Sequence, residues 1–170
     1  MPDDDAALPE PVRRYLHRAL PQRLPLIRRA VLRQSGLLRT GTRTARWLAF
    51  TADHVAVPPD TAFAWDARIA MPLAIPLRVR DAYGADGGSG RVSLWSLTLA
   101  SSAGSPEMNS GALHRYLAEA VWYPTALLPG GGLSWAPLDE HRATATLTDR
   151  GTTVSLEFRF DDAGDVTGVY

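Results

Sequence analysis

Hydrophobic and polar positions alternate along much of the chain, a pattern typical of β-strands that bury one face and leave the other in water. The clearest example covers residues 63–71, where Phe63, Trp65 and Ile69 alternate with polar or small residues. Less regular alternation predicts further strands at residues 28–39, 46–51, 133–137, 143–147, 154–160 and 166–170. The chain is therefore predicted to be rich in antiparallel strands joined by short turns.

Two more predicted strands flank a glycine-rich segment. Residues 77–83 and 91–99 are predicted to pair as an antiparallel hairpin, with residues 84–90 as its loop. Glycine reaches positive φ angles without strain, and a loop of this composition is expected to need several of them. Residues 51–54, just after the strand at 46–51, are predicted to form a helical turn.

The spacing of apolar residues becomes helical near the N-terminus, at residues 8–20. Val12, Leu16 and Leu20 share one stripe of this segment, and arginines occupy the other side. Prolines bracket the segment and acidic residues precede it, which suits the positive end of a helix dipole. We predict a short docking helix; binding to a membrane as a basic amphipathic helix is the alternative.

A second predicted helix, residues 110–128, turns apolar on every side. A helix of this kind lies inside a protein rather than on its surface. Pro124 denies the helix a backbone hydrogen bond, so we expect a break beside Trp122 and Tyr123. A break flanked by aromatic residues either lines a pocket or turns the chain inside a core.

Together these elements predict an α+β fold. We expect a single strongly curved antiparallel sheet, half-barrel-like, packed on the central apolar helix at 110–128, with a short N-terminal helix. The length of 170 residues fits a single domain, 1–170. The last strand begins at Val166 and reaches Tyr170 without a turn or cap, which points to a domain that is incomplete at its C-terminus.

Composition excludes several classes of chemistry. All 18 basic side chains are arginines, which excludes a Walker-A lysine or a Schiff base, and the lack of cysteine excludes disulfides and a thiolate nucleophile. The 18 carboxylates balance the arginines, so no net field attracts nucleic acid or an anionic membrane. The acidic start of the chain, and the lack of an apolar run of ~20 residues, favour a cytoplasmic protein without a strong membrane signal.

Metal and serine chemistry find little support in the sequence. The four histidines, at positions 17, 54, 114 and 141, fall on different predicted elements at no ligand spacing, so we expect no metal and no cofactor. Ser89 lies between two glycines as in a nucleophile elbow, but its setting is strand, loop and strand rather than strand, turn and helix. It is predicted to be a hairpin residue.

Glu119 is the one residue of the apolar helix that could carry chemistry, because it is the only charged residue between Arg115 and Asp139. In one interpretation it pairs with Arg115, four residues earlier on the helix. In the other it is desolvated among Trp122 and Tyr123, with a raised pKa. It could then act as an acid or base, or donate a hydrogen bond to a bound polar head group.

The end of the apolar helix carries a specific run of residues, which reads Trp122-Tyr123-Pro124-Thr125-Ala126-Leu127-Leu128-Pro129. The run follows Leu117-Ala118-Glu119-Ala120 and precedes Trp135 and the strands at 143–160. With residues 8–16 and 47–55, this pattern resembles an uncharacterised bacterial family of domains of unknown function. Members of that family run on past the position of Tyr170, so the resemblance implies a C-terminally truncated member. At the level of fold, a curved sheet on an apolar helix is similar to lipoprotein-carrier half-barrels, which hold acyl chains.

From these features we predict a non-enzymatic binding module that holds an apolar or lipid-like small molecule between the sheet and helix 110–128. The expected lining is Phe63, Trp65, Ile69, Trp95, Tyr116, Trp122 and Tyr123, with Glu119 at the polar end. One alternative is a small hydrolase or isomerase that uses Glu119 as acid or base. Another is an interaction subunit, in which the C-terminal edge strand pairs with a second copy of the chain. Nucleic acid is not an expected partner.

Overall fold

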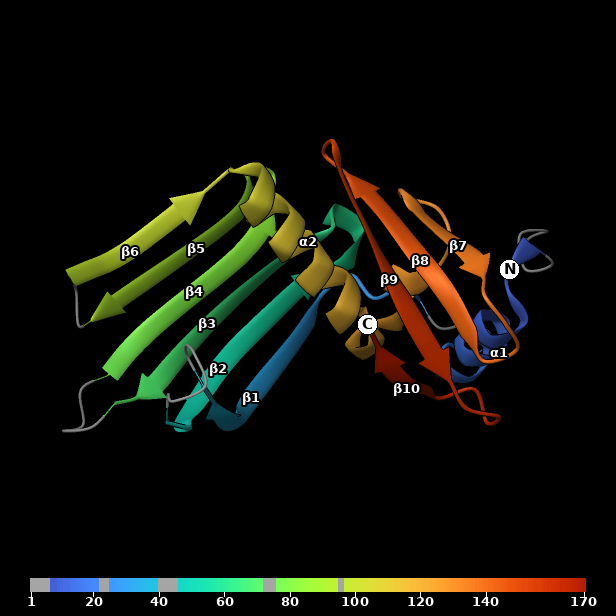
Figure 1. The fold of residues 1–170 in the computed structure, drawn as a ribbon, viewed down its shortest axis with the longest axis horizontal. Helices are drawn as coiled ribbons and strands as arrows, with labels where there is room; N and C mark the ends of the chain where they lie inside the picture. Colours follow the sequence, from blue (N-terminus) through green and yellow to red (C-terminus); the bar gives the residue numbers. More distant parts are fainter. Residues whose placement is uncertain (1–6, 22–24, 40–45, 72–75, 95–96) are drawn as a thin grey trace. The chain divides into compact units, whose positions relative to one another are not determined.

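The computed structural model of the chain describes residues 7–21, 25–39, 46–71, 76–94 and 97–170 (Figure 1). The chain divides into two compact units. The first, here called the central unit, is Arg29–Ala112; the second, the terminal unit, combines Met1–Arg28 with Leu113–Tyr170. Each unit contains an antiparallel sheet and helical residues, so the predicted α+β class is confirmed.

The central unit is built on a six-stranded antiparallel sheet in which each strand pairs with the next along the chain (Figure 1). Its strands are β1 (Ala30–Leu38), β2 (Leu48–Val57), β3 (Ala62–Ala70), β4 (Pro76–Gly84), β5 (Gly87–Leu94) and β6 (Leu97–Ala103). The short 3-10 helix η2 (Pro58–Asp60) joins β2 to β3. This uninterrupted order is a β-meander, the arrangement that short turns between strands produce.

The two faces of this sheet differ in chemistry, because side chains alternate between faces along each strand. The apolar face carries the even-numbered residues of β1, β2 and β5. It also carries the odd-numbered residues 63–69 of β3 and 77–83 of β4, and Leu97, Ala100 and Ser102 of β6. The opposite residues form the basic face, which carries five arginines: Arg33, Arg68, Arg78, Arg80 and Arg91. The alternation of side chains along the strands therefore gives the sheet one apolar face and one charged face.

Glycines in β5 allow helix α2 (Pro106–Glu119) to approach the sheet closely where it begins. The Gly88 amide donates a hydrogen bond of 2.7 Å to Asn109 Oδ1, and a Cβ atom at Gly88 would lie 2.4 Å from the Met108 carbonyl oxygen. No side chain larger than hydrogen fits there. The prediction of a loop at 84–90 is wrong for this reason: only residues 85 and 86 form the turn, and the glycines that follow belong to the strand.

The terminal unit packs α1 (Glu10–Ala19) against a four-stranded antiparallel sheet. The strands are β7 (Leu133–Pro137), β8 (Arg142–Asp149), β9 (Thr152–Phe160) and β10 (Val166–Val169), in the order β10-β9-β8-β7. Val12 and Leu16 of the helix are buried, and the Tyr15 ring lies 6.0 Å from that of Phe160. The predicted docking helix is confirmed, and β10 is an edge strand as expected.

The predicted helix at 110–128 is shorter and more broken than expected. The regular helix α2 ends at Glu119, and two short 3-10 helices follow, η4 (Ala120–Trp122) and η5 (Pro124–Leu127). Pro124 starts the second of these and cannot donate to the preceding turn, which explains why the α-helix does not continue.

Three other expectations require correction. A single curved sheet is not confirmed, because the strands form two sheets. The helical turn predicted at 51–54 is wrong, because these residues lie inside β2. The strand predicted at 91–99 is divided between the end of β5 and the start of β6. In the part of the chain that the structure describes, we find no helix of the length and apolar character needed to cross a membrane.

Candidate functional site

Glu119 forms an ion pair with Arg115 one helical turn earlier in α2. The Arg115 Nε atom donates a hydrogen bond of 3.0 Å to Glu119 Oε1. The two side chains are 25% and 17% exposed, so the pair is partly shielded from water. The pairing of these residues is therefore confirmed, whereas a role of Glu119 as acid, base or ligand-binding group stays a prediction.

Tyr116 and Tyr123 form a buried aromatic pair next to this ion pair in the sequence. Their ring centroids lie 5.6 Å apart, and the Tyr123 hydroxyl donates a hydrogen bond of 3.0 Å to the Tyr116 carbonyl oxygen. Burial raises the pKa of both phenols well above their usual value, so both are neutral at physiological pH. Trp122, in contrast, is 48% exposed. The break between the two 3-10 helices thus turns one aromatic residue inwards and leaves its neighbour in contact with water.

The predicted lining residues of the central unit lie on the apolar face of β3. Phe63 and Ile69 are buried, and the Phe63 ring stacks on the buried imidazole of His54 at 5.7 Å. Trp65 is half-buried, and its indole Nε1 donates a hydrogen bond of 2.7 Å to Gln34 Oε1. Trp95 lies outside the described residues.

The seven predicted lining residues that the structure describes therefore fall into two groups. Phe63, Trp65 and Ile69 share one strand face of the central unit. The other described members, Tyr116, Glu119, Trp122 and Tyr123, lie close together in the sequence of the terminal unit. Membership of both groups in one ligand site stays a prediction.

The apolar face becomes progressively more accessible towards β6. One row of paired residues crosses the sheet: Ala67 in β3 is fully buried, Val79 in β4 and Val92 in β5 are half-buried, and Ala100 in β6 is exposed. Leu97 on the same face is 69% exposed. Sequence reasoning missed these β6 residues because it placed 91–99 in one strand. A register shift in the β5–β6 pairing brings Leu97 and Ala100, three residues apart, to the same face, so alternation alone could not have identified them.

On the basic face, Asp66 lies near three arginines, Arg68, Arg78 and Arg80. Asp66 accepts a hydrogen bond of 2.8 Å from Arg78 Nε and lies 3.1 Å from Arg80 Nε. The hydrogen bond from Arg78 holds the pKa of Asp66 below its usual value. Arg80 also borders, with Arg91, a hollow of about 300 Å³ whose lining includes small side chains such as Ala82.

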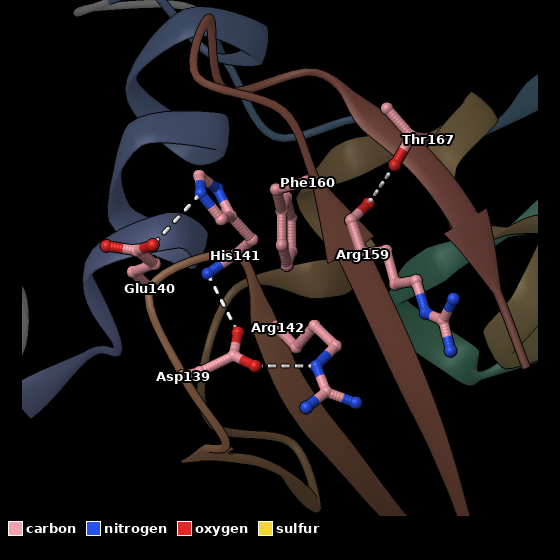
Figure 2. A pocket seen from close by; sticks show the side chains of 7 residues that line it. All are labelled: Asp139, Glu140, His141, Arg142, Arg159, Phe160 and Thr167. Carbon is pink, nitrogen blue, oxygen red and sulfur yellow. Dashed lines mark hydrogen bonds and ion pairs between the residues drawn. The ribbon is translucent and has the colours of Figure 1, made fainter.

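A larger open hollow, about 720 Å³, lies on the terminal unit (Figure 2). It is lined by Asp139, Glu140, His141, Arg142, Arg159, Phe160 and Thr167. Asp139 accepts hydrogen bonds from the His141 amide at 2.9 Å and from Arg142 Nε at 2.7 Å. These bonds lower the pKa of Asp139 and fix its carboxylate in the turn between β7 and β8.

Among the residues that the structure describes, no group of three histidine or carboxylate side chains is placed to bind a metal ion. The polar groups of Figure 2 are arranged as surface ion pairs; the His141 Nε2 atom, for example, lies 3.5 Å from Glu140 Oε1. Such pairs position loops and contribute little energy.

The geometry thus defines an α+β protein with an apolar face that is open on one side. Residues 1–170 match the family described as a Family of unknown function (DUF6544), and the chain belongs to that family. The resemblance inferred from the motif at residues 122–129 is thereby confirmed. Neither the curated proteins nor the solved structures yielded a match. Function must therefore be argued from the chain's own residues.

Proposed function

We propose that this protein is a non-enzymatic binding module that holds an apolar or lipid-like small molecule on the apolar face of its six-stranded sheet. The observation that carries this function is the exposure of that face at β6, where Leu97 is 69% exposed beside the half-buried Leu94. Continuous apolar surface in contact with water marks a binding site, because covering it releases about 25 cal/mol per Å².

The chemistry of the face matches an apolar occupant. In the described strands, Asp81 is the one residue on this face with a carboxylate or guanidinium group. Phe50, Trp65 and Val79 are half-buried and provide aromatic and aliphatic contact surface. An acyl chain needs only such contacts, each buried methylene contributing about 0.8 kcal/mol.

A half-barrel shape belongs to the same proposed function. The meander order of the six strands leaves the sheet unclosed, and antiparallel sheets twist and coil as strands are added. We place the apolar face on the concave side, with Phe63, Trp65 and Ile69 at its most deeply buried part. A ligand would enter from the exposed side, at β6.

Two neighbouring residues of β6 allow a matched test. Ala100 and Ser101 are both small and exposed, and they lie on opposite faces of the same strand. Ala100→Glu places a charge against a bound apolar chain, so we expect it to weaken binding of an environment-sensitive acyl probe at least about tenfold. Ser101→Glu adds the same charge to the basic face and should leave the affinity unchanged.

Fluorescence titration of the probe gives the measurement, with circular dichroism to show that each variant is folded. Saturable binding by the wild type, weakened only by Ala100→Glu, supports the assignment. An equal loss in both variants, or no saturable binding by a folded wild type, would show that this face is not the ligand site.

A further inference from the structure

The basic face of the central unit holds an arrangement of charges that is unfavourable in isolation. Arg68 lies directly opposite Arg78 across β3 and β4, and Arg80 lies directly opposite Arg91 across β4 and β5. Like charges at directly opposite positions of an antiparallel pair repel each other. Two carboxylates lie on this face: Asp66 contacts Arg78 and Arg80, and Asp53 lies directly opposite Asp66 on β2, 3.9 Å from Arg33.

The surrounding surface is open and does little to offset this charge. Arg68 and Arg91 are exposed, and small residues such as Ala64 and Ala82 lie beside them on the same face. In the described strands this face carries five arginines and two carboxylates, although the whole chain is balanced. Positive charge is therefore concentrated on one sheet face, and that face complements an extended anionic surface.

Two further features indicate which anionic surface fits. The described strand residues of this face include no aromatic side chain, and proteins that bind single-stranded nucleic acid rely on aromatic residues to stack on the bases. Val31 and Leu37 lie on the same face of β1 and are each 64% exposed. Exposed aliphatic residues beside arginines suit a lipid interface, where the apolar groups insert and the cations meet head groups.

We propose that the basic face of the six-stranded sheet docks on the surface of an anionic lipid bilayer. The docking is electrostatic, through Arg68, Arg78, Arg80 and Arg91, and the aliphatic residues of β1 add apolar contact at the edge. This interaction goes beyond ligand binding on the apolar face and does not depend on it, since the two faces carry different residues.

Co-sedimentation with vesicles tests the docking. The wild type should bind vesicles that contain phosphatidylglycerol, should not bind vesicles of phosphatidylcholine alone, and should be released by salt. Each arginine near an anionic surface contributes about a fivefold factor, so the double variant Arg68→Ser, Arg91→Ser should bind roughly twentyfold more weakly. Its thermal unfolding midpoint should not fall, because it removes one member of each like-charge pair.

The matched control is Arg13→Ser, Arg18→Ser, which removes the same charge from exposed positions on α1 of the terminal unit. This control should retain binding. The docking is refuted if both double variants lose affinity equally, if the wild type binds neither vesicle or both alike, or if it prefers single-stranded nucleic acid to the anionic vesicles. Binding of the acyl probe by the Arg68→Ser, Arg91→Ser variant should be unchanged, which separates this surface from the apolar face.

Discussion

The two sheets have apolar faces that arise from the same alternation of apolar and polar residues, but the two faces differ in how far they are buried. In the terminal unit, α1 contacts β8 and β9, and the apolar residues Val12, Ala145 and Phe158 are fully buried. In the central unit, burial on the apolar face decreases from Ala67 to the exposed Ala100. A period of two in the sequence therefore indicates which residues share a face, but not whether another element covers it.

This difference separates residues that stabilise the fold from residues that are available to a partner. Apolar surface that is covered in the folded protein contributes its transfer free energy to folding. Apolar surface that stays exposed contributes that free energy only when a partner covers it. Equivalent changes on the two faces should therefore differ in their effects on stability.

The largest expected effect is that of Phe158→Ala. Phe158 is fully buried and its ring contacts that of Trp135 at 5.1 Å, so we expect the free energy of unfolding to fall by about 3–5 kcal/mol. Phe50→Ala removes the same side chain from the half-buried apolar face and should cost about 1 kcal/mol. Urea titrations followed by circular dichroism give both values. Equal losses would mean that the two faces are equally well packed.

A pH effect should single out the terminal unit. Burial, with a smaller contribution from Asp165, raises the pKa of Tyr15 to about 12. The neutral phenol is thus favoured in the folded state, so its stabilising effect is complete below about pH 10 and is lost as the pH rises towards 12. About two pKa units correspond to roughly 2–3 kcal/mol.

Tyr15→Phe tests this expectation, because phenylalanine fills most of the same space and cannot ionise. The urea midpoint of the wild type should fall between about pH 10 and pH 12, and the variant should lose less over that range. Phenolate absorbance provides a second readout. Identical alkaline profiles for the two proteins would contradict the assigned role of Tyr15.

The smallest effect concerns ion pairs. Glu119→Gln breaks the partly shielded pair with Arg115 and should cost about 1 kcal/mol, whereas Asp53→Asn, beside Arg33 on the basic face, should cost almost nothing. A double-mutant cycle with Arg115→Gln isolates the coupling between the two residues. A neutral or stabilising Glu119→Gln would show instead that desolvation of the carboxylate dominates.

The sequence predicted the strands best where the apolar residues are large. Residues 63–71 alternate between bulky and polar side chains, and they lie in β3 almost throughout. The segment at 51–54 was predicted wrongly because the inward residues of β2 there are Ala52 and His54, whose size and polarity hide the alternation. Residues 87–90 were predicted as a loop because the approach of α2 to Gly88 is a tertiary contact that leaves no local pattern.

The candidate site was predictable only where it depends on local spacing. The Arg115–Glu119 pair follows from a separation of four residues on a helix, and the structure contains it. The hydrogen bond from Tyr123 to Tyr116 was not predicted, because it depends on how the chain turns at Pro124. The exposure of the apolar face at Ala100 depends on which elements cover the sheet, and no pattern within a strand encodes that.

The order of the elements along the chain determines when each of them can pack during synthesis. The six-stranded sheet is one continuous segment in which every strand pairs with its neighbour, whereas α1 must meet β8 and β9, as the contact of Tyr15 with Phe160 shows. Contacts between distant parts of a chain form slowly, and a protein leaves the ribosome from its N-terminus. The helix α1 therefore emerges before the central sheet but can bury its apolar stripe only after that sheet, β8 and β9 have been made.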